Sequence, residues 1–177
     1  MKLFSILFFF IHTIAYAQVD AEQNINQSYH KYFNLGLDRY ENGEFKNSCL
    51  FFISAIAIAK KQNLKNPSSK INYSDAEANA LATYRYVADS LIRAEELAKA
   101  EELTNLINEV LPNNITVLTN YINIALKKGD NDKSEKYINE AIAIDPNNKQ
   151  LYYILGTSLI KLKQNEKAEF NLLKAIE

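Results

Sequence analysis

The sequence predicts an all-α fold, an α-solenoid built from about four antiparallel helix pairs. The first observation is a period of about 34 residues, set by Pro112 in Leu-Pro-Asn-Asn and Pro146 in Asp-Pro-Asn-Asn. The second is that apolar residues recur at helical spacing before and after a turn within each interval. The third is glycine at the expected turns, Gly43 and Gly129. Neither helix of such a pair could bury its apolar stripe alone, so the pairs must pack and stack.

Residues 1–17 have the layout of a secretory signal peptide. Lys2 precedes an apolar run over 3–14, and Ala15-Tyr16-Ala17 forms a small-x-small cleavage pattern before Gln18. The run is shorter than the roughly 20 residues that a membrane-spanning helix needs, which favours cleavage and leaves no stable membrane span. We therefore expect an exported protein, periplasmic, associated with the cell envelope or secreted, with residues 18–28 as an N-terminal linker.

Residues 29–62 form the first predicted helix pair. Its first helix carries Tyr32, Leu35 and Gly36, the turn is Asn42-Gly43-Glu44, and an apolar stripe follows from Phe45. Residues 63–74 form an irregular insert that interrupts the period. Ser74 and Glu77 then form a capping-box pattern, with Ser74 as the predicted N-cap. The helix that follows extends to about Arg93, opening a degenerate second repeat over 75–114 whose turn is expected at 93–96.

The third repeat, 115–148, and the fourth, 149–177, match each other closely. Gly129 ends the first helix of the third repeat, and Pro146 follows its second helix. Gly156 lies inside a predicted helix, where glycine costs about 1 kcal/mol relative to alanine. Such a position favours a close approach of two helices. The fourth repeat is predicted to be incomplete, which favours either a fragment or self-association through an uncapped last repeat.

These residues resemble the tetratricopeptide repeat. The resemblance rests on Tyr152, Leu155-Gly156, Ala168, Leu172 and Ala175 after Asp145-Pro146, and on the matching residues of 29–62. It implies a right-handed superhelix whose concave groove binds a protein or peptide partner. The residues implied to line that groove are Phe33, Leu37, Tyr40, Arg85, Asp89, Ile92, Thr119, Asn123, Lys127, Tyr153, Thr157 and Lys161.

The sequence offers no pattern typical of catalysis. His30 is the only histidine after the predicted cleavage site, so no His-based triad and no zinc-type ligand set is expected. The glycines are explained by turns and helix packing, so we predict no phosphate-binding loop and no cofactor. A net charge of −1 argues against nucleic acid as a partner. Cys49, the only cysteine, lies in an apolar run and is interpreted as a small buried side chain.

Two functions remain open at this point. The first is a non-enzymatic scaffold, exported to the periplasm or cell envelope, that binds a segment of a partner protein. The second is the N-terminal sensory or assembly region of a larger protein, such as a signalling kinase or a wall-binding protein. The partner's identity does not follow from the sequence.

Overall fold

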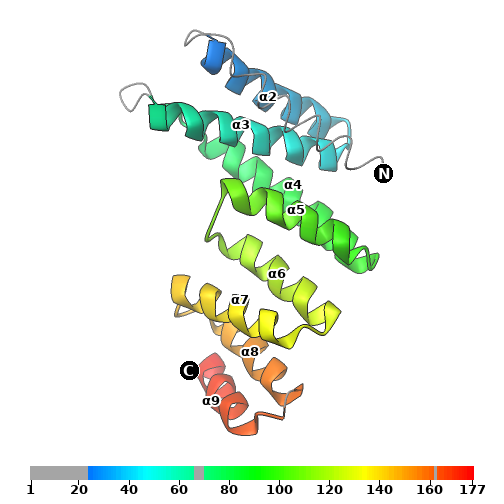
Figure 1. Cartoon of the computed structure of the whole chain (residues 1–177), viewed down its shortest axis with the longest axis vertical. Coiled ribbons are helices and arrows are strands. Elements are labelled where there is room, and N and C mark those ends of the chain that lie inside the picture. The colour runs from blue at the N-terminus through cyan, green and yellow to red at the C-terminus, as the bar shows by residue number, and fades with distance from the viewer. Residues whose placement is uncertain (1–23, 66–69, 162) are drawn as a thin grey trace. The chain divides into compact units, whose positions relative to one another are not determined.

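The computed structural model describes residues 24–65, 70–161 and 163–177, and within these ranges the regular secondary structure is helical (Figure 1). The predicted signal peptide (1–17), residues 18–23, part of the predicted insert (66–69) and the side chain of Lys161 lie outside the described residues. The all-α prediction is confirmed. The helices are α2 Asn24–Glu41, α3 Phe45–Lys65, α4 Ser74–Arg93, α5 Leu97–Val110, α6 Ile115–Lys128, α7 Asn131–Ile144, α8 Lys149–Lys161 and α9 Asn165–Ile176.

Contacts divide the chain into two compact units, one ending at Tyr84 and the other beginning at Arg85. In the first unit α2 and α3 pack as a hairpin, with the Phe33 and Phe52 rings 5.6 Å apart and the Ser48 hydroxyl donating to the Gly36 carbonyl at 2.7 Å. Helix α2 begins at Asn24, so residues 24–28 are helical and the predicted linker is too long. The prediction missed them because this polar stretch lacks an apolar stripe.

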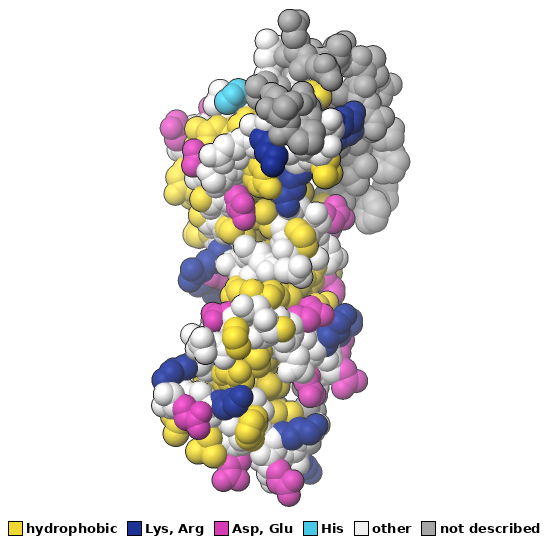
Figure 2. Space-filling model, turned by 90° about the vertical axis from the view of Figure 1, so that its left-hand side faces the viewer, with side chains coloured by type: hydrophobic (Ala, Val, Ile, Leu, Met, Phe, Trp, Pro, Cys, Tyr) yellow, Lys and Arg dark blue, Asp and Glu magenta, His cyan; other side chains and the backbone are white. Residues whose placement is uncertain are grey.

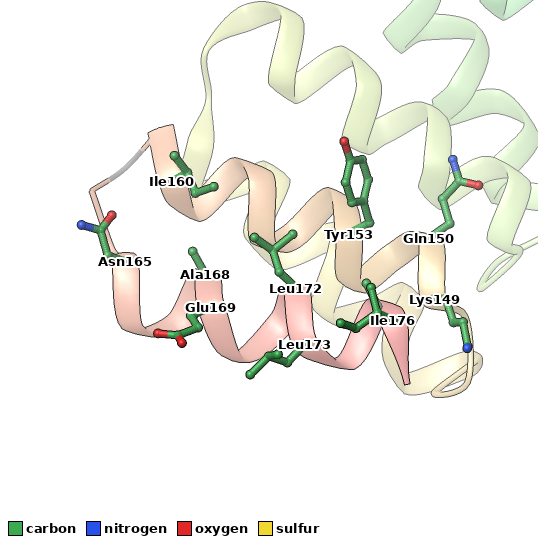
Figure 3. A pocket seen from close by; sticks show the side chains of 11 residues that line it. Lys149, Gln150, Tyr153, Ile160, Asn165, Ala168, Glu169, Leu172, Leu173 and Ile176 are labelled. Carbon is green, nitrogen blue, oxygen red and sulfur yellow. The ribbon is translucent and has the colours of Figure 1, made fainter.

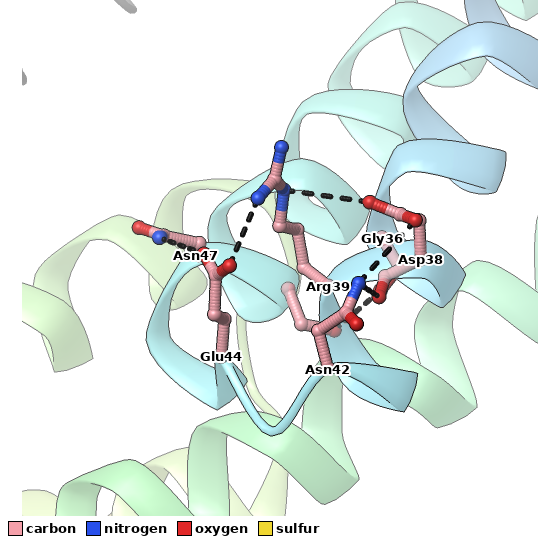
Figure 4. Close-up of polar contacts among 7 residues, drawn as sticks. Gly36, Asp38, Arg39, Asn42, Glu44 and Asn47 are labelled. Atoms are coloured by element: carbon pink, nitrogen blue, oxygen red, sulfur yellow. Dashed lines mark hydrogen bonds and ion pairs between the residues drawn. The ribbon is translucent and has the colours of Figure 1, made fainter.

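The hairpin turn between α2 and α3 is held by polar contacts drawn in Figure 4. The Arg39 guanidinium donates to Glu44 Oε1 at 2.9 Å, and the Asn42 amide donates to the Asp38 carbonyl at 2.8 Å. The hydrogen bond from Asn47 and the bond from Arg39 lower the pKa of the Glu44 carboxyl. The carboxylate therefore remains ionised in this network down to lower pH than an ordinary glutamate.

Helix α4 begins one residue before the predicted start. Asn63 exchanges two hydrogen bonds with the backbone of Ile71, which fixes the chain just before the helix. The Ser74 amide then donates to Asn72 Oδ1, and the Glu77 amide donates to the Tyr73 carbonyl. The first helical bond is accepted by Tyr73, so Tyr73 and not Ser74 occupies the N-cap position. The predicted capping box is wrong because the Glu77 amide, which was expected to donate to the Ser74 hydroxyl, donates to the Tyr73 carbonyl instead.

Cys49 is fully buried in the first unit, and its thiol donates weakly to the Ala80 carbonyl at 3.8 Å. Burial raises the pKa of the Cys49 thiol to about 12. The nucleophilic thiolate is therefore scarce at neutral pH. The interpretation of Cys49 as a small buried side chain is confirmed.

The hairpin turns share one geometry even where the sequences differ. Gly43, Glu95, Gly129 and Lys163 all take a left-handed backbone, with φ between 58° and 75°. The residue after each donates its amide to the carbonyl five residues earlier, at 2.8 to 3.0 Å, as in a Schellman motif. The last three of these positions recur at the same period as Pro112 and Pro146. The turn expected at 93–96 is confirmed, and the second repeat keeps the shared geometry without a glycine.

The second unit has its main apolar core between α6, α7, α8 and α9. Leu118, Ile122, Ile138 and Leu159 are almost fully buried in it. A second cluster joins Ile92 of α4, Ala100 of α5 and Ile124 of α6. No helix within the described ranges combines the length and apolar character needed to cross a membrane.

Candidate partner-binding groove

A polar groove of about 390 Å³ lies in the second unit, between the C-terminal half of α4, α6 and the start of α8. Each of these is the first helix of a predicted repeat. The lining therefore comes mainly from equivalent helices of successive pairs, as the solenoid interpretation requires. It consists of Arg85, Asp89, Ile115, Thr116, Thr119, Asn120, Asn123, Asn148, Gln150, Leu151 and Ile154.

Four of the predicted groove residues come together here: Arg85, Asp89, Thr119 and Asn123. Lys127, Tyr153 and Thr157 of the same unit do not line this groove. Tyr153 lines an apolar pocket on α8 and α9, which adjoins the groove at Gln150 (Figure 3). The groove therefore contains predicted residues from α4 and α6, whereas its lining on α8 is Gln150, Leu151 and Ile154 in place of the predicted Tyr153 and Thr157.

Ile92 was predicted to face the groove, and this prediction is wrong. Its side chain is 8% exposed and packs with Ala100 and Ile124. The helical spacing from Arg85 and Asp89 puts Ile92 near the same face, but the final turn of α4 packs against α5 and α6. An apolar side chain gains more free energy from burial there than from exposure in a polar groove.

The predicted groove residues of the first unit, Phe33, Leu37 and Tyr40, lie along α2. Phe33 is half-buried between Tyr29 and Phe52, with ring centroids 6.0 and 5.6 Å away. Phe33 therefore contributes to the α2–α3 core. Leu37 and Tyr40 are exposed, and Tyr40 meets Phe45 edge to face at 5.4 Å.

Sequence reasoning missed Asn120, which lines the groove although the residue is only 3% exposed. Its side-chain amide makes no hydrogen bond within the described part of the chain. Described side-chain N and O atoms that are sealed from solvent all have a partner, so the Asn120 amide must open onto the groove. A signal was present in the sequence, because Thr116, Asn120 and Asn123 follow i, i+4, i+7 spacing and therefore share one face of the helix.

Some of the other polar side chains in the groove lining already make a hydrogen bond within the chain, and others are open to a ligand. The Thr119 hydroxyl donates to the Ile115 carbonyl at 2.8 Å, and the Asn148 amide donates to Asp145 at 3.1 Å. The side-chain amides of Asn123 and Gln150, like that of Asn120, have no partner among the described residues. The groove thus presents several amides, each able to donate and accept.

One wall of the groove carries both signs of charge. Arg85 and Asp89 lie one turn apart on α4, and neither forms an ion pair with another described residue. Arginine can bind a carboxylate through two parallel hydrogen bonds, and a carboxylate accepts from cations or amides. In the described ranges, no three His, Cys, Asp or Glu side chains group closely enough to hold a metal ion. The groove's chemistry is that of hydrogen bonding and charge pairing.

Comparison with known proteins places the chain in a family. A family model described as "Meiosis protein SPO22/ZIP4 like" matches residues 17–176. The chain belongs to this SPO22/ZIP4-like family. No curated protein matches the sequence.

Solved structures support the helical-repeat fold. The chain is similar to the structure titled "MamA AMB-1", with a TM-score of 0.50 and 14% identity over 82% of this chain and 96% of that one. A structure of a MamA point mutant has a TM-score of 0.50 and 14% identity, over 85% and 91% of the two chains. MamA is a tetratricopeptide-like protein, so the predicted tetratricopeptide-like fold is confirmed.

Proposed function

We propose that this SPO22/ZIP4-like chain is a protein-interaction scaffold, acting by binding and not by catalysis, and that the polar groove of the second unit holds an extended segment of a partner protein. The observation that carries the proposal is Asn120, an almost buried amide that opens onto a groove and has no partner among the described residues. In the free chain, water confined in the groove must meet its hydrogen bonds, and a partner's backbone could replace that water.

An extended peptide matches the groove because its backbone alternates N–H donors and C=O acceptors. The Asn120 amide could accept from one peptide N–H and donate to a neighbouring carbonyl, and Asn123 and Gln150 lie in the same lining. Arg85 and Asp89 would then select side chains of opposite charge on the partner. Main-chain contacts would supply affinity and the charged wall would supply specificity.

The Asn120→Leu variant tests this proposal. Leucine has a similar volume but no hydrogen-bonding atoms, so it removes the unpaired amide without opening a cavity. We expect the free energy of unfolding to stay level or rise by about 1 kcal/mol, while binding to partner peptides is lost. The measurement compares urea unfolding of both chains with their binding to an array of synthetic extended peptides. Peptides that bind both chains equally would contradict the role of Asn120.

Arg85 and Lys127 provide a matched pair for the charged wall. Both are cations on first helices of repeats, but Arg85 lines the groove and Lys127 does not. Arg85→Glu is therefore expected to weaken binding of array peptides that carry a carboxylate about tenfold or more. Lys127→Glu, with the same charge change, should leave that binding unchanged. Equal losses would indicate long-range electrostatics and not a contact in the groove.

We also propose that the protein is exported and that residues 1–17 are removed. The support is the layout of those residues, together with a family match that begins only at residue 17. Intact mass of the protein purified from its natural source should correspond to a chain beginning at Gln18. A mass that includes residues 1–17 would exclude this cleavage, and the meiotic role that the family's description names would become the function to test.

A further inference from the structure

The polar groove carries one charge of each sign, and both charges lie on α4. Arg85 and Asp89 are the charged residues of its lining, and the rest consists of amides, hydroxyls and apolar side chains. The lining therefore has no net charge. On the face drawn in Figure 2, the basic and acidic side chains of the described residues are likewise interspersed. A uniformly acidic or uniformly basic segment would be attracted by one charge of the groove and repelled by the other.

Arg85 and Asp89 are available to a ligand although they lie one helical turn apart. Neither side chain forms an ion pair, with the other or with a further residue, in the part of the chain that the structure describes. Their order accounts for this, because the better helical ion pair has the acidic residue four positions before the basic one. Between them Val87 and Ala88 are buried, which fixes this turn of α4. The two charges are thus presented at a set separation.

This separation matches the repeat of an extended peptide. Four residues of α-helix rise by about 6 Å. In an extended chain the side chains on one face recur at every second residue, about 6.7 Å apart. Side chains at i and i+2 of such a segment can therefore reach Arg85 and Asp89 together. Side chains at i and i+1 cannot, because they point to opposite faces of the segment.

The α6 side of the groove is neutral at the matching positions. Thr119 and Asn123 lie one repeat period after Arg85 and Asp89, and both line the groove. The side chain at i+1 of an extended segment, which points away from α4, therefore needs no charge. A volume of about 390 Å³ lies at the small end of the range for ligand sites, so the groove suits a segment of a few residues.

We propose that the groove recognises an extended segment with an acidic and a basic side chain two residues apart, the acidic one paired with Arg85 and the basic one with Asp89. This inference rests on the proposed function, because it requires the groove to hold an extended segment. It adds the charge pair that the segment must carry. Either order of the two charges fits the spacing, and the preferred order reports the direction in which the segment runs along α4.

A series of synthetic nonapeptides tests the charge pair. Each peptide has blocked termini and a background of threonine and glutamine, with one glutamate and one lysine separated by one, two, three or four positions, in both orders. Affinities for the purified chain are measured by fluorescence anisotropy. We expect one order at a separation of two positions to bind about tenfold or more tightly than any other separation, because only there do both charges meet their partners.

The double variant Arg85→Asp/Asp89→Arg exchanges the two charges and keeps the composition of the chain. It should still prefer a separation of two positions but reverse the preferred order of the charges in the peptide. All affinities should fall about twofold, because the exchanged order favours an ion pair within the helix. Lys127→Glu changes a charge on α6 outside the groove lining, so it should alter neither the preferred separation nor the preferred order.

The possible outcomes separate this inference from the proposed function. Binding that Asn120→Leu abolishes but that is indifferent to the separation of the charges would overturn the charge pair and leave the groove as a peptide site. Binding that depends on the separation but not on Asn120 would uphold the charge pair and contradict the role of Asn120. If the parent and exchanged chains preferred the same order, pairing with Arg85 and Asp89 would be overturned. Absence of binding by every peptide to a chain whose circular dichroism shows it to be folded would overturn both proposals.

Discussion

Replacing Gly156 with valine is expected to destabilise the second unit by about 1–3 kcal/mol. A Cβ at this position would lie 2.6 Å from Leu172 Cγ, 2.8 Å from Leu172 Cδ2 and 3.2 Å from the Ala168 carbonyl oxygen. Cγ of Leu172 is close to the backbone and cannot swing away as the tip of a flexible side chain can. Helices α8 and α9 would have to separate, and the core that contains Leu155 and Ala168 would loosen.

Urea unfolding followed by far-UV circular dichroism measures this effect. Gly129→Ala serves as a control of another kind, because Gly129 has open space around it but a φ of 72°. Gly129→Ala should lower the free energy of unfolding by about 1 kcal/mol, from backbone strain alone. Leu172→Ala should lessen the cost of Gly156→Val, because it removes the clashing atoms, whereas it should not lessen the cost of Gly129→Ala. A Gly156→Val chain as stable as the parent would contradict the close approach of α8 and α9.

The sequence predicted this close approach because glycine inside a strong helical pattern costs stability unless the neighbouring helix needs the space. Gly36 occupies the matching position of the first helix pair and makes a similar close approach, since a Cβ on Gly36 would lie 2.6 Å from the Phe52 ring. The repeat period was equally informative, because it reflects the length of one helix pair. It located a turn at Glu95 even though that residue favours a left-handed backbone no more than most.

The groove was predictable only in part. Arg85, Asp89, Thr119 and Asn123 follow from helical spacing, since they lie on faces that the repeat leaves polar. Asn120 shares a helical face with Thr116 and Asn123, but whether such a position is buried against a core or lies at a groove floor depends on how closely α4, α6 and α8 approach. The prediction that Ile92 faces the groove was wrong for the same reason. The spacing along one helix predicts the direction in which a side chain points. The packing of the neighbouring helices determines whether that side chain meets a core or a groove.

Replacing Phe52 with alanine is expected to destabilise the first unit by about 3–5 kcal/mol. Phe52 is fully buried, and its ring fills the space left by Gly36 while packing against the Phe33 ring. Gly36 has no side chain that could move into the vacated volume, so the cavity would persist. The cost of a large-to-small change rises with the cavity that remains.

Phe51→Ala is the matched control for Phe52→Ala. Phe51 precedes Phe52 on α3, is half-buried and packs loosely against Tyr32, with centroids 6.2 Å apart. Truncating it removes the same number of atoms but leaves a space open to water, so the loss should be smaller, about 1–2 kcal/mol. Thermal or urea unfolding of the two variants compares them directly. If both lost equal stability, the α2–α3 hairpin would depend on total apolar area and not on the Phe52 ring seated against Gly36.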